Sequence, residues 1–430
     1  MGISSGPRLD PAARNSDLPG RVSIEVEAVP VLSWALARHG VPVVSRLLLT
    51  GGAVPVRSAE VTVQVRTADG PLGSPAVLRA DLAPGRTTVL AAVDLHLDAD
   101  VLSRIPAARP GVIEVSVAAD GTELACSSTP VQVLGAAQWL AAPAPLALAM
   151  LAAHVLPDDP AAAALVGGAA DLLELRTGDP SLADSTCGPE LIDRTVAAIV
   201  EAMRRRGVRH SPAPADWART ALTVRTPGEV LESRLGSSLD TAVVLAAALE
   251  HAGIRPLLWI AEGHAFLGYW RTPGGTGSTV TTEVDGLVEL VERGAVQLVD
   301  ATMLTAEAEP ATFGDLHRTP HAAWLTGDLH RITGVTDVHR ARLDGIRPLP
   351  VPGADPARRR ARQPPARDDG WTRLALTLGT TPPPRVEQWA AELRDLAPNR
   401  TAGWLDDSAG PSVLLPRSAA DRLQAGTPAP

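Results

Sequence analysis

Residues 225–270 read RTPGEVLESRLGSSLDTAVVLAAALEHAGIRPLLWIAEGHAFLGYW. Within this stretch, the run from Ser238 to His251 is rich in Ala, Leu and Val, which predicts an apolar helix. Two apolar runs on either side of a turn at Gly263 predict a pair of strands. The run VQLVDATML at 296–304 predicts another buried strand. The order of one helix followed by strands therefore decides the fold of this half of the chain.

Three polar residues of these elements form a candidate catalytic site. Ser238 opens the helix, where free backbone N–H groups and the positive end of the helix dipole can hold a nucleophile or a developing oxyanion. His264 opens a strand and is placed to act as a general base, and Asp300 lies in the last strand and is placed to orient it. The chain order Ser, His, Asp differs from the order Ser, Asp, His of α/β-hydrolases.

The same stretch resembles the transglutaminase-like domain near the N-terminus of long bacterial helicase-like proteins. The blocks RTP, GSSLD and GHAF carry the resemblance in this order, and it extends from about Val22 to Pro350, including the RLDGIRPLP exit. In that family a β-rich domain comes first, followed by this domain, a linker and a helicase core. The resemblance implies an α+β protein with an N-terminal immunoglobulin-like β-sandwich and a transglutaminase-like domain of the papain-like cysteine-protease fold.

The sequence departs from the family at the nucleophile. The family pattern is Gly-Thr-Cys-Leu-Asp, whereas this chain has Gly-Ser-Ser-Leu-Asp, so Ser238 occupies the cysteine position. His264 matches the family histidine, and Asp300 falls where the family carries an acidic residue at a strand end. The sequence contains no helicase core.

Serine in place of cysteine changes the expected activity. A thiol with a pKa of about 8.5 readily becomes a thiolate beside a histidine, whereas a serine hydroxyl needs concerted base catalysis. We therefore expect a pseudoenzyme, a non-catalytic binding or regulatory protein related to helicase-associated N-terminal regions. The alternative is a hydrolase or acyltransferase that acts on amide or ester bonds through Ser238, His264 and Asp300.

The expected partner is a protein. The helicases of the resembling family suggest an indirect link to a helicase or to nucleic acid, but this rests on analogy of context alone. The cluster at 358–362, RRRAR, is the local feature that could contact nucleic acid. The formal net charge of −9 gives such a role no support.

The first half of the chain has a different pattern. The runs RVSIEVEAV, EVTVQVRT, TTVLAAVDL and VIEVSVAAD alternate apolar and polar residues, and turn pairs such as Asp120-Gly121 separate the strands. This pattern predicts a β-sandwich that serves as a scaffold or interaction module. After it, apolar runs predict helices at 144–154, 159–175 and 189–206.

These patterns divide the chain into five parts. The predicted boundaries give a flexible leader at 1–20, the β-sandwich at 21–135, and a helical subdomain with the transglutaminase-like domain at 136–346. A linker rich in Pro and Arg follows at 347–384, and a short helix with a degenerate tail at 385–430.

The composition excludes several kinds of site. The sequence has no lysine, so all 39 basic residues are arginine, which excludes a P-loop and Schiff-base chemistry. The cysteines Cys126 and Cys187 are too few for a four-cysteine metal site, and we assign neither a role. His317 and His321 are four residues apart with Pro320 between them, which disfavours a metal site. We expect neither a metal nor a cofactor.

The sequence also bears on location. Residues 1–20 lack the apolar core of a signal peptide, and the longest apolar stretch, at 146–155, is too short to span a bilayer. We therefore expect a cytoplasmic protein without a membrane partner.

Overall fold

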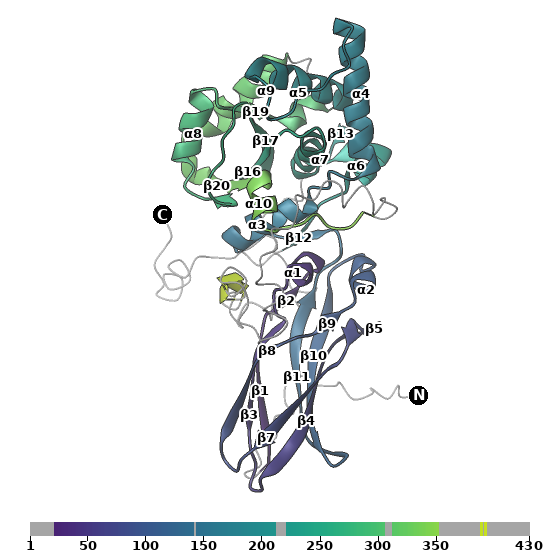
Figure 1. Ribbon diagram of the computed structural model, residues 1–430, viewed down its shortest axis with the longest axis vertical. Coiled ribbons are helices and arrows are strands. Elements are labelled where there is room, and N and C mark those ends of the chain that lie inside the picture. Colours follow the sequence, from purple (N-terminus) through teal and green to yellow (C-terminus); the bar gives the residue numbers. More distant parts are fainter. Residues whose placement is uncertain are drawn as a thin grey trace, which may run out of the picture. The chain divides into compact units, whose positions relative to one another are not determined.

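The computed structural model describes residues 21–141, 143–211, 221–305, 312–351, 388–389 and 391–393 (Figure 1). The chain divides into two units between Ala136 and Ala137, and the described residues 388–389 and 391–393 are grouped with the first unit. Both helices and strands are present, which confirms the predicted α+β class. The predicted leader, most of the linker and most of the tail lie outside the described residues.

Two larger sheets and a two-stranded ladder of β6 with β9 are found among the described residues of the first unit. One has the strand order β1 (Ser23–Ala28), β3 (Val44–Thr50), β8 (Thr87–Val93). The other has the order β2 (Val31–Leu32), β11 (Thr122–Val133), β10 (Arg109–Ala119), β4 (Val56–Thr67), β5 (Gly70–Pro71), and β7 (Ala76–Leu82) also pairs with β4. The sheets contact each other along both sides, because β1 contacts β11 and β7 contacts β8.

The alternating sequence pattern explains the core of this unit. Alternate residues of β4 and β10 are buried, as at Val61, Val63 and Val65 of β4. At the turn from β10 to β11, Asp120 and Gly121 both have positive φ, 49° and 76°, as a tight hairpin turn requires. The remaining elements of this unit are short: α1 (Trp34–Arg38), β6 (Gly73–Ser74), β9 (His96–Leu97) and α2 (Ala99–Ser103).

The first strand segment changes sheets within a few residues. β1 pairs with β3 in one sheet, and after Val29 and Pro30 the chain continues as β2, which runs parallel to β11 in the other sheet. The N–H of Gln132 donates to the carbonyl of Pro30 at 2.8 Å, where the second pairing begins. The same segment therefore borders both sheets.

A five-stranded sheet is the centre of the second unit. Its order is β18 (Val280–Thr281), β20 (Ile332–Asp337), β16 (Pro256–Ala261), β17 (His264–Trp270), β19 (Val296–Val299), and all its pairs are antiparallel. Two short ladders accompany it, β12 (Gln138–Leu140) with β14 (Ala221–Thr223) and β13 (Arg209–His210) with β15 (Leu235–Gly236).

Helices bury both faces of this sheet. Alternate residues of β16 and β17 belong to two separate apolar clusters, so that Leu258 and Leu267 lie in one and Trp259 and Phe266 in the other. The first cluster includes α3 (Ala144–His154), α4 (Pro160–Thr177), α5 (Pro189–Arg204) and α7 (Ser238–His251), and the second includes α8 (Asp285–Glu292). Continuous apolar strands are expected in a sheet covered on both faces.

The structure differs from the sequence prediction near the end of this unit. The predicted strand 296–304 ends at Val299, and a 3-10 turn, η1 (Ala301–Leu304), follows Asp300. The inner strand β20 was not predicted from the sequence. The rest of this unit comprises α6 (Pro227–Ser233), α9 (Phe313–Pro320), a π-helical turn η2 (His321–Leu325), a 3-10 turn η3 (Leu329–Arg331) and α10 (Val338–Leu343).

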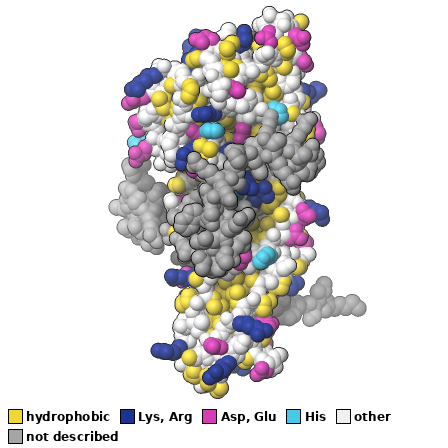
Figure 2. All heavy atoms as spheres, viewed as in Figure 1, with side chains coloured by type: hydrophobic (Ala, Val, Ile, Leu, Met, Phe, Trp, Pro, Cys, Tyr) yellow, Lys and Arg dark blue, Asp and Glu magenta, His cyan; other side chains and the backbone are white. Residues whose placement is uncertain are grey.

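No helix among the described residues is both long enough and apolar enough to span a bilayer. On the face shown in Figure 2, acidic and basic side chains are interspersed over the described surface.

Candidate functional site

The N-terminus of α7 is fixed by a dense set of hydrogen bonds. The Ser237 hydroxyl caps the N–H of Asp240, and the Asp240 carboxylate accepts in return from the N–H of Ser237 at 2.9 Å. The same carboxylate, 1% exposed, accepts from the backbone N–H and the guanidinium of Arg225 at 2.8 and 2.9 Å. Asp240 therefore supports this helix end, and Arg225 adds an ion pair that the sequence analysis missed.

Ser238 is held at the first turn of this helix. Its side chain is buried, with 2% of the residue exposed. Its Oγ accepts a hydrogen bond from the N–H of Ala265 at 3.3 Å, so the helix start is joined to β17. Among the described residues, no hydrogen bond joins Ser238 to His264. The hydroxyl is therefore next to the histidine strand without being coupled to the imidazole.

His264 and Asp300 form a pair. His264 is the first residue of β17, and its Nε2 lies 3.2 Å from Oδ2 of Asp300, which directly follows β19. The two strands are neighbours in the sheet, with Leu267 opposite Val299, and this pairing brings the two side chains together. The Nδ1 atom of His264 has no hydrogen-bond partner among the described residues.

The Asp300 carboxylate is held in its charged form. Its other oxygen, Oδ1, accepts from the N–H and the hydroxyl of Thr302 at 2.9 and 2.7 Å. Burial raises the pKa of Asp300, but the hydrogen bond and charge of His264 together with the bonds from Thr302 outweigh it. The pKa of Asp300 therefore lies below its ordinary value, as suits a carboxylate that orients an imidazole.

An aromatic stack covers the imidazole. The ring of Trp324 lies 5.7 Å from that of His264, at an interplanar angle of 8°. The guanidinium of Arg331 lies over the ring of Trp324, 4.5 Å from the ring centroid, and pairs with Glu262 at 3.7 Å. This cover is formed by η2 and η3, and no local sequence pattern marks it.

The other residues singled out from the sequence make contacts of their own. Cys187 is half-buried in the loop before α5, where its Sγ lies 3.8 Å from Asp184, and Cys126 is exposed on β11 in the first unit. The Nδ1 of His317 accepts from the N–H of Leu298 at 3.1 Å, and its ring centroid lies 6.1 Å from that of His321.

The surroundings of His317 favour its neutral form. Burial lowers the pKa of His317, and the neighbouring charges of His321 and Arg271 lower it further. Within the described part of the chain, no group of three or more His, Cys, Asp or Glu residues is placed to hold a metal ion. The arginine cluster 358–362 lies outside the described residues.

A serine, a histidine and an acid are thus brought to one place. The histidine is hydrogen-bonded to the acid, but among the described residues it is not hydrogen-bonded to the serine. Comparison with known protein families and with curated proteins finds no match for this chain.

Proposed function

We propose that this chain is a transglutaminase-like protein in which serine has replaced the catalytic cysteine, and that it acts as a non-catalytic binding or regulatory protein. The proposal includes an immunoglobulin-like sandwich for the first unit, a papain-like fold for the second, and a descent shared with helicase-associated N-terminal regions. The GSSLD and GHAF blocks support the relationship, because they occupy the start of α7 and the start of β17.

One observation supports the non-catalytic role above the others. The Oγ of Ser238 is 3.3 Å from a backbone N–H that donates to it, and the residue is 2% exposed. A nucleophilic serine needs its hydroxyl proton directed at a base and its oxygen open to the substrate. Here the oxygen is turned toward the backbone, and Trp324 lies on the imidazole that would be the base.

A second candidate function is a serine hydrolase or acyltransferase. The retained pair of His264 and Asp300 favours it, because binding of Nε2 to the carboxylate leaves the lone pair of Nδ1 available as a base in the neutral ring. In this alternative, Ser238 rotates toward Nδ1 when a substrate binds, and the N–H groups at the start of α7 hold the oxyanion.

Activity-based labelling separates the two functions. We expect a fluorophosphonate probe to leave Ser238 of the wild-type protein unlabelled. We expect Ser238→Cys to react with iodoacetamide at that position, and to react more slowly when His264→Ala is added, because the imidazole promotes thiolate formation. Cys126 and Cys187 are free thiols, so both are replaced by serine in the labelling background.

The outcome is read by mass spectrometry of the labelled peptide. Fluorophosphonate on Ser238 of the wild-type protein would overturn the non-catalytic role and establish the serine enzyme. Ser238→Cys labelling that does not depend on His264 would mean that the site geometry of the family is not retained.

A further inference from the structure

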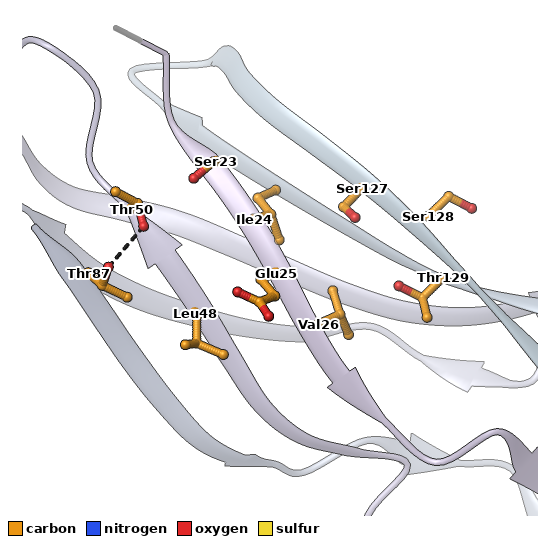
Figure 3. A pocket seen from close by; sticks show the side chains of 10 residues that line it. All are labelled: Ser23, Ile24, Glu25, Val26, Leu48, Thr50, Thr87, Ser127, Ser128 and Thr129. Carbon is orange, nitrogen blue, oxygen red and sulfur yellow. Dashed lines mark hydrogen bonds between the residues drawn. The ribbon is translucent and has the colours of Figure 1, made fainter. Parts of the chain in front are cut away.

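The first unit has an open edge where its two sheets come together. A hollow of about 480 Å³ lies between β1 and β11 (Figure 3). Ile24 and Val26 of β1 border it on one side, and hydroxyl side chains border much of the rest: Ser23, Thr50, Thr87, Ser127, Ser128 and Thr129. Beyond Pro30 the chain joins the two sheets by backbone hydrogen bonds, through the pairing of β2 with β11.

β1 offers backbone groups to a further strand at this edge. Among the described residues it pairs with β3 alone, so the edge that faces the hollow has N–H and C=O groups without a strand partner. The opposite border is less suited to pairing, because Pro130 of β11 has no N–H and β2 already occupies β11 at Gln132 and Val133. Strand addition is therefore favoured along Ser23–Ala28.

The side chains of β1 define what such a strand must carry. Ile24 is 5% exposed and points to the buried side, while Glu25 is exposed on the outer face opposite Leu48. Residues directly opposite each other on neighbouring strands point to the same face. The added strand thus needs small apolar side chains opposite Ile24 and Val26.

The negative charge of Glu25 determines which residue of an added strand is favoured opposite it. Glu27 on the same face is paired with Arg46 at 3.8 Å, but Glu25 has no ion pair among the described residues. A basic side chain opposite Glu25 would supply one. A second copy of β1 would instead bring Glu25 and Glu27 against their own counterparts, and like charges across strands are destabilising.

We propose that β1 is a docking edge for an extended basic segment of a protein partner, which adds a fourth strand to the sheet β1–β3–β8 and fills the hollow beside β11. This mode of recognition gives affinity through the main chain and specificity through alternate side chains. The inference makes the proposed binding role specific and rests on it.

The test uses the full chain and a synthetic peptide, acetyl-Thr-Val-Arg-Val-Thr-amide, whose arginine can lie opposite Glu25. Hydrogen–deuterium exchange is measured at about 1 mM peptide, a concentration suited to a short weak ligand. We expect the outward amides of Ser23–Ala28 to exchange about tenfold more slowly, because only those amides gain a partner. Two control peptides carry glutamate instead of arginine, or methyl groups on every backbone nitrogen, and neither should protect β1.

A variant with the charge of residue 25 reversed tests whether Glu25 selects a basic peptide. In Glu25→Arg, the glutamate peptide should protect β1 and the arginine peptide should not. Equal protection by both peptides, protection of β11 instead of β1, or no protection in any combination would each overturn the proposal. Protection of β1 that grows with protein concentration alone would show that a second copy is the occupant.

These readouts are independent of the labelling experiment at Ser238, which lies in the other unit. If fluorophosphonate labels Ser238 while the arginine peptide still protects β1, the non-catalytic role alone is overturned. If Ser238 stays unlabelled and the arginine peptide does not protect β1, the docking edge alone is overturned.

Discussion

The Nε2 of His264 lies 3.2 Å from Oδ2 of Asp300, while the Oγ of Ser238 accepts its hydrogen bond from the N–H of Ala265. The carboxylate thus orients the imidazole, and the oxygen of the neighbouring hydroxyl accepts from the backbone instead of contacting the imidazole. The structure therefore couples the histidine to the acid and leaves the serine uncoupled from the histidine. It also makes the pair of His264 and Asp300 testable as a structural element in its own right.

The charge on Asp300 should make the free energy of unfolding depend on pH in the acidic range. The pKa of this carboxyl lies below its ordinary value of 3.8, so the folded protein binds fewer protons there than the unfolded chain. Its contribution is fully present above pH 3.8 and is lost as the pH falls through the lower folded pKa. We expect Asp300→Asn, which can keep the bonds from Thr302, to lower the free energy of unfolding at pH 7 by about 1–3 kcal/mol.

Urea unfolding at a series of pH values measures this effect. The difference between Asp300→Asn and the wild-type protein should shrink at the acid end. A difference that stays constant with pH would contradict the assignment of the charge to this pair.

Asp240 should be more important for stability than the other residues of its capping box. Asp240→Ala removes the partner of Arg225 and leaves the N–H groups of Arg225 and Ser237 without their acceptor. We expect a loss of about 3 kcal/mol, at the lower end for a broken buried pair because Arg225 is 37% exposed. The control Ser237→Ala, which removes a cap only, should cost about 1 kcal/mol by the same urea titration. Equal losses from the two variants would show that the tie to Arg225 contributes little.

Trp324 should protect His264 from reagents in solution. In Trp324→Ala the stacked ring is gone, and we expect diethylpyrocarbonate to modify His264 about fivefold faster, corresponding to about 1 kcal/mol of lost contact. Trp324→Phe keeps an aromatic ring over the imidazole and serves as the matched control. Site-resolved mass spectrometry distinguishes His264 from the other histidines, and an unchanged rate in Trp324→Ala would mean that the stack does not limit access.

Tyr269 provides an alkaline reporter, because it is the single tyrosine of the chain. Burial raises the pKa of Tyr269 well above 10.0. The charge of Asp193 raises it further, as does the hydrogen bond that the Tyr269 hydroxyl donates to the Asp193 carboxylate at 2.8 Å. Its raised pKa means that its stabilising effect is complete below pH 10.0 and is lost as the pH rises through the folded pKa. We expect phenolate absorbance to appear only together with unfolding, as followed by circular dichroism, whereas phenolate formation in the folded protein would contradict this.

The sequence was informative where a pattern is local. The helix at Ser238–His251, the paired strands around Gly263 and the alternating strands of the first unit follow from the period of their apolar residues. These elements place the three polar residues, and the strand pairing then brings His264 to Asp300.

The sequence was less informative where the cause is distant. β20 was not predicted, because Gly334 interrupts its pattern and because its partner β16 lies far upstream in the chain. The stack of Arg331 and Trp324 on His264 joins segments that no spacing rule connects. The direction of the Ser238 hydroxyl depends on one backbone N–H of a neighbouring strand, which residue identity alone does not reveal.

The change of sheets at Val29 and Pro30 has a mechanical consequence. Because β2 and β11 run parallel, the start of β2 and the end of β11 lie at opposite ends of their ladder. Tension applied between the two ends of this unit therefore acts along the strands and loads the bonds of Pro30 with Gln132 and of Leu32 with Leu134 together, in shear. Such a unit should need a higher force to unfold, because the two backbone hydrogen bonds must break together and not one after the other.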